Sequence, residues 1–412
     1  MARYYIKTFG CKVNQVESDE LHASLQSMGM QSSDNPARCD FIIVNTCTVT
    51  GEADKKVRKE LRRSARLSNI MGVVVTGCAA KLNEEELESL DEKIYVLTDR
   101  SKIPSFFASF SEVLPITDAA DLSEDEHMVS SRRVRVPVKI QDGCEDFCSY
   151  CIVPFARGTC SSVSPDAIIQ RVKSLVEAGT KEIILTGINL GNYTDGNSDS
   201  GSSLVRLLRR IQNESSLHRV RLSSIEPRHV CDDLISFLSE EDSILCGHLH
   251  IPLQSGSDYV LGDMNRSYSA NEYLQLVERL RVAIPDIAIS TDLIVAYPSE
   301  TEEDFEATLD LCSQLRFADA HIFRYSPREG TAAAHLKPLS PKIIRRRAQT
   351  LREELEKSSS EYRTSRLGSQ MEVIVEQVDE EKGLATGTSR EYLRVKIPLD
   401  NHRVGDLVST EL

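Results

Sequence analysis

No stretch of the sequence comes near the roughly 18–20 consecutive apolar residues that a membrane-spanning helix needs. The opening segment, MARYYIKTFG, also lacks the apolar core of a secretory signal peptide. The chain has 412 residues, of which 40% are hydrophobic, so it can bury sizeable cores and its length fits two or three domains. We therefore expect a soluble, cytoplasmic protein of several globular domains with no membrane partner.

Acidic side chains outnumber basic ones, 63 to 49. The net charge of −14 argues against a surface coated with basic residues for non-specific nucleic-acid binding. The sequence has no solenoid-type repeat and no low-complexity tract. Its eleven cysteines are spread through a long chain of cytoplasmic type, where thiols stay reduced. A disulfide scaffold is therefore disfavoured, and metal or cluster ligation explains the cysteines better.

Strand-like and helix-like runs alternate along most of the chain. In residues 1–115, the runs YYIKTF, FIIVN and VVVTG are separated by helical patterns, which predicts a parallel α/β domain. Residues 116–133 are acidic and aperiodic, as in a linker. Six strand–helix units follow in residues 134–366, fewer than the eight of a closed barrel, so we predict a partial (β/α)6 barrel. Short alternating strands in residues 368–412 predict a small β-barrel.

Three cysteines lie together in the segment GCEDFCSYC, directly after the first strand of the predicted barrel. Cys144, Cys148 and Cys151 are thus expected on one loop at the functional face of the barrel. Three thiolates leave one iron of a 4Fe–4S cluster without a protein ligand, and S-adenosylmethionine (SAM) can chelate that iron. A zinc knuckle is the alternative, but it usually needs four ligands in paired C-x2-4-C units, and no second pair follows. We predict a SAM-binding cluster here.

Three further cysteines each follow a strand-like run. Cys11, Cys47 and Cys78 come directly after YYIKTFG, FIIVNT and VVVTG, and each spacing fits one βα unit. Because the carboxyl ends of parallel strands share one edge, these cysteines should converge there as ligands of a second cluster. Burial as small core residues is the alternative for any one of them. We read the cysteines without such a pattern as core residues: Cys39, Cys160, Cys231, Cys246 and Cys312.

The motifs resemble those of the radical SAM methylthiotransferases over essentially the whole chain. The matching segments are TFGCKVNQVES, NTCTVT, TGCAA, DGCEDFCSYCIVPFARG, LTGINLGNY, HIPLQSGSDYVLGDMNRSY, TDLIVAYPSET and HIFRYSPREGTAA. GINLGNY and FRYSPREGTAA are most similar to the branch that acts on N6-threonylcarbamoyladenosine in tRNA, the MtaB branch. The resemblance implies an amino-terminal methylthiotransferase domain, a radical SAM core and a terminal TRAM-like domain that binds RNA.

The resemblance also implies the chemistry. Two 4Fe–4S clusters and SAM serve as cofactors: the barrel cluster reduces SAM to release a 5′-deoxyadenosyl radical, the auxiliary cluster presents sulfur, and a second SAM donates the methyl group. The product carries a methylthio group on carbon 2 of the adenine next to the anticodon. That carbon has an unactivated C–H bond, so cofactor radicals must act on it, and no catalytic side chain is implied beyond the cluster ligands. The implied partners are a tRNA anticodon stem-loop and an electron donor such as flavodoxin or ferredoxin.

Five residues carry over as expected SAM contacts. By position, Tyr150 should lie near the adenine of SAM, Gly187 and Asn189 near its amino group, and Gln254 and Ser257 at the same mouth of the barrel. Each of these could instead be an ordinary turn or strand-end residue.

The chain departs from the family pattern at three places. It has Ala296 and Ser299 where the family usually has glycine, and TCSS follows the ARG segment where a basic run is common. The first two changes could tighten packing around SAM. The third puts phosphate contacts by that segment in doubt.

Two segments are locally basic, although a charged helix face is usually just solvated. Residues 52–66 and 337–366 each carry more lysine and arginine than acidic side chains, so we expect them to attract phosphates. The terminal domain is acidic overall, so it would have to bind RNA through shape and stacking, for example by Tyr392.

Two kinds of alternative remain open at this point. The same enzyme could act on isopentenyladenosine in tRNA or on an aspartate of a ribosomal protein. A protein of another class, a non-catalytic RNA-binding protein with structural metal sites, would also use clustered cysteines.

Overall fold

The computed structural model describes residues 2–110, 133–197 and 201–412. The predicted acidic linker lies outside these residues, apart from Arg133. The chain divides into two compact units. Unit 1 holds residues 1–132 together with Cys151–Gly158 and Arg328–Gly330, and unit 2 holds the remainder.

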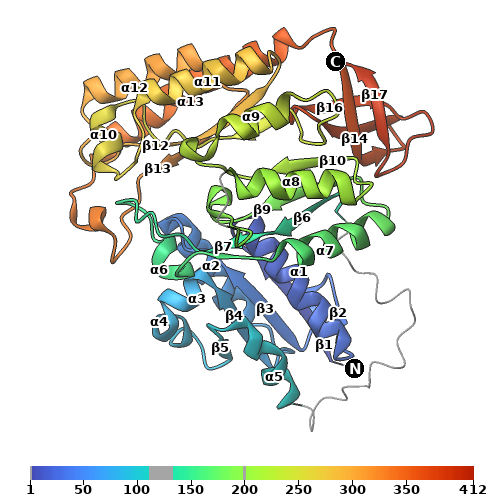
Figure 1. The fold of residues 1–412 in the computed structure, drawn as a ribbon. Coiled ribbons are helices and arrows are strands. Elements are labelled where there is room, and N and C mark those ends of the chain that lie inside the picture. The colour runs from blue at the N-terminus through green and yellow to red at the C-terminus, as the bar shows by residue number, and fades with distance from the viewer. Residues whose placement is uncertain (1, 111–132, 198–200) are drawn as a thin grey trace. The chain divides into compact units, whose positions relative to one another are not determined.

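Unit 1 is built on a parallel sheet with the strand order β2-β1-β3-β4-β5 (Figure 1). Every residue of Phe41–Thr46 and of Gly72–Gly77 is buried, as expected for central parallel strands covered on both faces. The strands are β1 (Arg3–Thr8), β2 (Gln31–Ser32), β3 (Phe41–Thr46), β4 (Gly72–Gly77) and β5 (Ile94–Val96).

Helices cover both faces of this sheet. On one face, Leu25 and Phe107 pack against Phe41, and on the other face Leu61 packs against Val75. A further helix from the segment 151–158 contacts α3. The helices are α1 (Lys12–Ser27), α2 (Gly51–Ala65), α3 (Cys78–Leu82), α4 (Glu84–Glu88), α5 (Ile103–Ala108) and α6 (Val153–Arg157).

Unit 2 contains a partial barrel of six parallel strands. They form two sheets with the orders β10-β9-β6 and β11-β12-β13, and the bridges Val220–Leu245 and Ser224–His250 connect the sheets. The predicted α/β class with a partial barrel is thereby confirmed. The strands are β6 (Arg135–Lys139), β9 (Glu182–Thr186), β10 (Arg219–Leu222), β11 (His248–His250), β12 (Ala288–Val295) and β13 (Asp319–Arg324), with a hairpin of β7 (Gln141–Asp142) and β8 (Ser161–Ser162).

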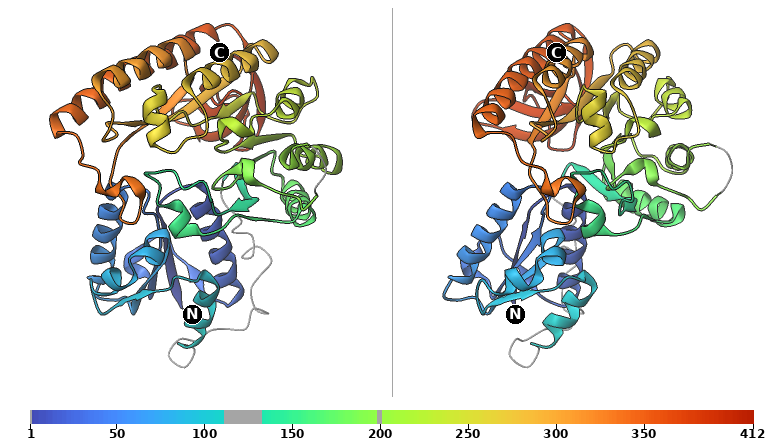
Figure 2. Two further views of the ribbon diagram at one scale, coloured as in Figure 1. Left: turned by 60° about the vertical axis from the view of Figure 1, so that its left-hand side comes forward. Right: turned by 90° about the vertical axis from the view of Figure 1, so that its left-hand side faces the viewer.

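Helices form the outer layer of the barrel, and the long α13 packs on β13 and α12 (Figure 2). Several begin at strong caps: Ser164 precedes Pro165, and Thr301 forms a capping box with Asp304. The helices are α7 (Pro165–Glu177), α8 (Ser203–Glu214), α9 (Asp232–Ser239), α10 (Asp258–Asp263), α11 (Ala270–Ala283), α12 (Glu302–Leu315) and α13 (Pro341–Ser365).

Alternation along the strands separates a core face from an inner face of the barrel. On β12, Ile289 and Leu293 belong to the core that the helices cover. The next residues along the strand point to the opposite side. We call this side the inner face and define it by side chains on three adjacent strands, namely His248, His250, Ser290, Asp292 and His321.

The carboxyl-terminal strands form an antiparallel sheet with the order β16-β15-β14-β17. Its residue Gly387 has no room for a side chain, since a Cβ there would lie 2.1 Å from the carbonyl oxygen of Ile374. The sheet curls over a small core that includes Val373 and Ile397. The strands are β14 (Gln370–Asp379), β15 (Leu384–Ser389), β16 (Arg394–Pro398) and β17 (Leu407–Glu411).

Two buried arginines join this sheet to the barrel. Arg219 donates to the carbonyl oxygen of Thr388 at 2.9 Å, and Arg221 donates to those of Ser389 and Arg390, both at 2.9 Å. The terminal sheet therefore packs against the starts of the barrel strands.

Tyr392 takes part in the same packing. Its ring is half-buried and stacks on His248 with centroids 4.6 Å apart, and the guanidinium of Arg221 lies 4.8 Å from the ring centroid. The expectation that Tyr392 stacks on RNA is therefore wrong, because its faces are used inside unit 2.

Among the described residues, none of the helices combines the length and the apolar character that crossing a membrane requires.

Candidate functional site

The three cysteines of unit 1 lie at the carboxyl edge of its sheet. Cys11 lies at the N-cap position of α1, three residues after the end of β1. Cys47 directly follows β3, and Cys78 opens α3 directly after β4. Gly10 has a φ of 111°, and a Cβ there would lie 3.2 Å from the Cys47 sulfur, so the chain approaches this thiol closely. Burial, and secondarily the charges of Cys78 and Cys11, raises the pKa of Cys47 to about 11. The structure thus brings the three thiols together.

Two asparagines hold the loops that carry these thiols. Asn14 donates to the carbonyl oxygen of Thr46 at 2.9 Å, and Asn45 donates to that of Asn14 at 2.9 Å. The Cys11 thiol donates to the side-chain oxygen of Asn14 at 3.2 Å. Because both asparagines are buried, they fix the positions of the loops after β1 and β3.

Arg157 brings positive charge to the same edge. Its Nε donates to the Cys78 sulfur at 3.2 Å and its Nη2 donates to Asn14 Oδ1 at 2.9 Å, while Nη1 pairs with the buried carboxylate of Glu17. Burial raises the pKa of the Cys78 thiol, and Arg157 opposes that rise. Three converging thiols with a buried cationic donor fit an iron–sulfur cluster held by thiolates. Sequence reasoning did not assign Arg157 a role, because its partners are distant in the chain.

A second arginine fixes the loop that follows Cys47. Arg328 donates from Nη1 to Asp54 Oδ2 at 2.6 Å and also donates to the hydroxyl of Thr48, which itself donates to Asp54 Oδ1 at 2.7 Å. Thr48 follows Cys47 directly, so this contact fixes the backbone beside a predicted ligand. Sequence reasoning missed it as well.

The second set of cysteines lies in the loop after β7. Cys144 and Cys148 belong to unit 2, whereas Cys151 begins the segment that belongs to unit 1. The Cys144 thiol donates to Asp146 Oδ2 at 3.4 Å, and Cys148 Sγ accepts from Arg266 Nη1 at 3.2 Å. All three cysteines are half-buried.

Hydrogen bonds shape this loop. Asn265 donates to the carbonyl oxygens of Asp146 and Phe147 at 3.3 and 3.2 Å, and the Ser149 amide donates to that of Met264 at 3.0 Å. Phe147 has a φ of 45°, a conformation that turns the chain back between two of the cysteines.

Arg266 gives Cys148 the kind of support that Arg157 gives Cys78. It also pairs with the carboxylate of Glu226. Burial raises the pKa of the Cys148 thiol, and Arg266 opposes the rise. Arg266 thus supports one of the three predicted cluster ligands.

Of the five residues predicted to contact SAM, Gly187 and Asn189 follow β9, Gln254 and Ser257 follow β11, and Tyr150 lies in the cysteine loop. Tyr150 packs against a buried cluster that includes Met264 and Tyr297, and Gln254 has a φ of 67°. Asn189 donates from Nδ2 to Asp146 at 2.9 Å, in the cysteine loop.

Two of the five have evident structural roles. A Cβ on Gly187 would lie 2.9 Å from the side-chain oxygen of Gln141, so this position requires glycine. The hydroxyl of Ser257 caps α10 and donates to Asp304 Oδ1 at 2.5 Å. A part for any of the five residues in SAM binding stays a prediction.

The departures from the family pattern have local consequences. Ala296 has a φ of 61°, a conformation that glycine adopts without strain, and its amide donates to the Glu300 carboxylate at 2.9 Å. Ser299 donates to Asp263 Oδ2 at 2.5 Å. In the TCSS segment, the Cys160 amide donates to Glu145 at 3.1 Å, and the two serines form β8.

The two basic segments differ. On α2, Lys55, Lys59 and Arg62 are exposed. On α13, by contrast, Arg347 is buried and pairs with Glu300 at 2.6 Å. Part of the charge of the second segment is therefore used inside unit 2, which weakens its case as a phosphate-binding surface.

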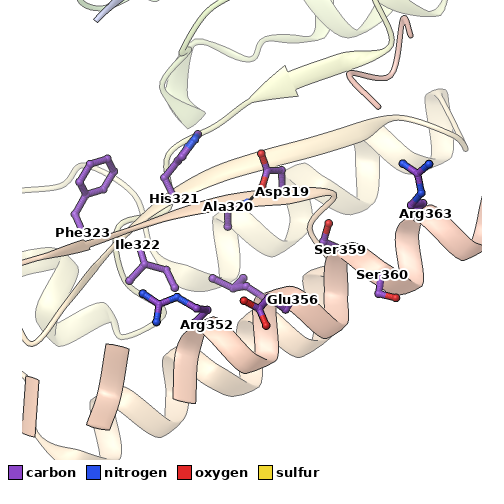
Figure 3. Close-up of a pocket in the computed structure, with 11 residues that line it drawn as sticks. Asp319, Ala320, His321, Ile322, Phe323, Arg352, Glu356, Ser359, Ser360 and Arg363 are labelled. Atoms are coloured by element: carbon purple, nitrogen blue, oxygen red, sulfur yellow. Dashed lines mark hydrogen bonds between the residues drawn. The ribbon is translucent and has the colours of Figure 1, made fainter. Parts of the chain in front are cut away.

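A cavity of about 670 Å³ lies between β13 and α13 (Figure 3). Ile322, Arg352 and Glu356 are among its lining residues. Its lining includes no cluster cysteine and no predicted SAM contact, so we assign it no part in the chemistry.

Comparisons with known proteins show the family of the chain. Residues 138–312 match the model of the radical SAM superfamily, and residues 3–98 match uncharacterized protein family UPF0004. Threonylcarbamoyladenosine tRNA methylthiotransferase MtaB of Bacillus subtilis is 32% identical over 100% of this chain and 94% of its own length. The MtaB of Thermotoga maritima is 35% identical over 99% of this chain and 93% of its own length. The chain belongs to the radical SAM methylthiotransferase family.

A relative with a different name is about as similar. The tRNA-2-methylthio-N(6)-dimethylallyladenosine synthase of Ruegeria sp. is 32% identical over 98% of this chain and 94% of its own length. Among solved structures, the radical SAM methyltransferase TsrM of Kitasatospora setae has a TM-score of 0.57 at 15% identity, covering 81% of this chain and 77% of that one. That likeness shows the fold alone.

This methylthiotransferase is therefore an enzyme that transfers a methylthio group and uses 4Fe–4S clusters and SAM. The predictions of family, enzyme class and cofactors from the sequence are confirmed. The comparisons leave the choice between the two adenosine substrates open.

Proposed function

We propose that this methylthiotransferase acts on tRNA and adds a methylthio group to carbon 2 of N6-threonylcarbamoyladenosine next to the anticodon. The names of its full-length relatives support a tRNA substrate, since they describe enzymes that modify adenosines of tRNA. A cytoplasmic location would suit such a substrate.

We base the choice between the two nucleosides on the polarity of the inner face. An isopentenyl group is apolar and needs an apolar pocket, whereas a threonylcarbamoyl group brings amide, hydroxyl and carboxylate groups that need hydrogen-bonding partners. The inner face presents two imidazoles, a hydroxyl and a carboxylate on adjacent strands, from His250, Ser290, Asp292 and His321. A polar substituent fits this surface better.

We assign the cluster ligands by the two sets of thiols. Cys144, Cys148 and Cys151 would hold the cluster that binds SAM, and Cys11, Cys47 and Cys78 would hold the auxiliary cluster. When bound, the clusters and two SAM molecules supply the radical, the sulfur and the methyl group, which no side chain can provide. A low-potential one-electron donor such as flavodoxin or ferredoxin would supply the electrons.

The side chains of the enzyme would position and shield these groups. Arg157 and Arg266 each direct an N–H group at a ligand sulfur, and Asn14 and Asn45 hold the strand-end loops in place. The exposed cations of α2 begin eight residues after Cys47, so phosphates that bind there would lie in the same unit as the sulfur donor.

The ligand assignment can be tested by iron content. We expect about eight irons per chain in the reconstituted wild type, and about four in Cys47→Ala and in Cys148→Ala, because each variant loses one four-iron cluster. Cys39→Ala is the matched control, since Cys39 is also buried in unit 1 but precedes β3, and it should keep both clusters. Unchanged iron in Cys47→Ala would refute the auxiliary site.

The substrate can be tested by mass spectrometry of tRNA nucleosides from cells that lack the protein. The 2-methylthio form of threonylcarbamoyladenosine should disappear, its unmethylthiolated form should accumulate, and wild type but not Cys47→Ala should restore the product. Loss of the isopentenyl product instead would identify the other branch. An unchanged nucleoside pool would refute a tRNA substrate and favour a ribosomal protein or a binding role.

A further inference from the structure

Three side chains of the inner face converge on one point from three adjacent strands. His250 ends β11, Asp292 lies in the middle of β12, and His321 lies on β13. The registers pair His250 with Ser290 and Asp292 with His321 across neighbouring strands. Figure 3 shows His321 on the side of β13 that points away from α13, as the alternation along the strand requires.

The donor atoms are arranged as ligands rather than as a simple pair. His250 Nε2 lies 3.2 Å from Asp292 Oδ2, and His321 Nδ1 lies 3.3 Å from the other carboxylate oxygen, Oδ1. One ligand atom from each residue lies within 4.8 Å of the others. Ligands about 2.0–2.2 Å from a Zn²⁺ ion are separated by roughly 3–3.5 Å, so the three side chains need little movement to share an ion.

A second layer of contacts orients one of the imidazoles. The other ring nitrogen of His250, Nδ1, lies 2.9 Å from the hydroxyl oxygen of Ser290, which leaves Nε2 directed at Asp292. The same hydroxyl lies 2.9 Å from His248 Nε2. A hydrogen bond to the second nitrogen of a ligating histidine is a common feature of metal sites, because it fixes the tautomer and the ring orientation.

We propose that His250, Asp292 and His321 form a binding site for a divalent first-row transition metal ion such as Zn²⁺, separate from both sets of cluster cysteines. Two imidazole nitrogens and one carboxylate are the donors that such ions prefer over Mg²⁺ or Ca²⁺. Three protein ligands leave at least one coordination position for water or an oxygen of a ligand. The side chain of His321 is 61% exposed, so that position is open to exchange with solvent.

The electrostatics agree with a cation at this point. The carboxylate of Asp292 is half-buried between the two imidazoles, where a positive charge would compensate its own. A bound ion would provide that charge while both imidazoles stay neutral, which is the form in which histidine ligates metals.

The test uses the full chain with both iron–sulfur clusters loaded, so that the cluster cysteines are not available to zinc. Equilibrium dialysis against Zn²⁺ is followed by measurement of zinc and iron per chain. The wild type should bind one zinc ion with no loss of iron. Ser290→Ala removes an outer-sphere hydrogen bond and should weaken zinc binding by roughly 10–100-fold. His321→Gln and Asp292→Asn each remove a ligand and should weaken it by at least as much.

His335→Gln is the matched control, since His335 is exposed in unit 2 outside the inner face, and its zinc binding should equal that of the wild type. Iron content and circular dichroism show whether each variant is folded, and the exposed His321 is the position least able to disturb folding. X-ray absorption at the zinc edge should show nitrogen and oxygen ligands with imidazole scattering.

Three results would overturn the proposal. These are no zinc uptake by the holoenzyme, uptake that His321→Gln and Asp292→Asn leave unchanged, and sulfur ligands in the absorption spectrum, which would place the zinc on cysteines. None of these measurements depends on the tRNA substrate, so the metal site and the proposed function can fail independently.

Discussion

Replacing Glu182 by glutamine should detach the terminal sheet from the barrel. Glu182 is fully buried at the start of β9, and its two carboxylate oxygens accept from Arg219 Nε at 2.7 Å and Arg221 Nε at 3.0 Å. Both arginines are themselves buried, and their remaining N–H groups bind carbonyl oxygens of the terminal sheet. Glu182 therefore pairs with two buried cations that join two parts of unit 2, and it is the carboxylate nearest to both, since Arg219 has a second, longer ion pair with Glu372 at 3.3 Å.

The size of the effect follows from this burial. Removing one partner of a buried ion pair costs about 3–5 kcal/mol, because it leaves an uncompensated charge in a region of low dielectric. The amide of glutamine can still accept one hydrogen bond, but it carries no charge. The terminal strands β14 and β15 should thus open more often. An opening free energy lowered by about 3–5 kcal/mol corresponds to about 10²–10⁴-fold faster exchange of their amide hydrogens.

Hydrogen exchange followed by mass spectrometry measures this directly. Protection should fall in β9, β10, β14 and β15 of Glu182→Gln, while β3 and β4 of unit 1 act as an internal control and stay unchanged. Glu214→Gln is a second control, because the ion pair of Glu214 with Arg210 is on the surface and should contribute nothing measurable. Unchanged protection in β15, or an equal loss in unit 1, would refute the reasoning.

Three further predictions follow from single side chains. Arg157→Gln removes the N–H group directed at the Cys78 sulfur, so iron should be lost to a chelator about 10–100-fold more readily from the amino-terminal site. Arg100 also pairs with Glu17, at 2.8 Å, so Arg100→Gln is the control and should retain the iron. Ala296→Gly relieves the left-handed backbone at that position and should stabilise unit 2 by about 1 kcal/mol, seen as a rise of about 2 °C in its melting temperature. Burial lowers the pKa of His22 below its usual 6.5, so the stability of unit 1 should be constant above that pH and should fall as the pH drops below it, and His22→Gln should flatten this fall in denaturation measured between pH 7 and 5.

Most of the fold could be predicted because its central strands, such as β3, β4, β9 and β10, are buried on both faces. FIIVN and VVVTG became β3 and β4, and the six strand–helix units became a partial barrel. Glu182, Arg219 and Arg221 could not be predicted in their roles. Charged side chains inside strand-like runs are unusual. The carbonyl oxygens that accept hydrogen bonds from the two arginines lie more than 150 residues further along the chain.

The candidate site, too, could be predicted only in part. Parallel strands must end at a common edge, so the positions of Cys11, Cys47 and Cys78 followed from local patterns alone. Arg157 and Arg266 were missed, because an arginine that donates to a sulfur looks, in the sequence, like any other arginine. Only the tertiary contacts distinguish them.

These two arginines show a common way of supporting thiolates. Each directs one N–H group at a cysteine sulfur and is held by a carboxylate, Arg157 by Glu17 and Arg266 by Glu226. The carboxylate cancels most of the long-range charge of the guanidinium, so its effect on the sulfur must come mainly from the directed hydrogen bond. Such a bond needs the planar fork of arginine, which can bind the carboxylate and the sulfur at once, and lysine would keep the charge but lose that geometry.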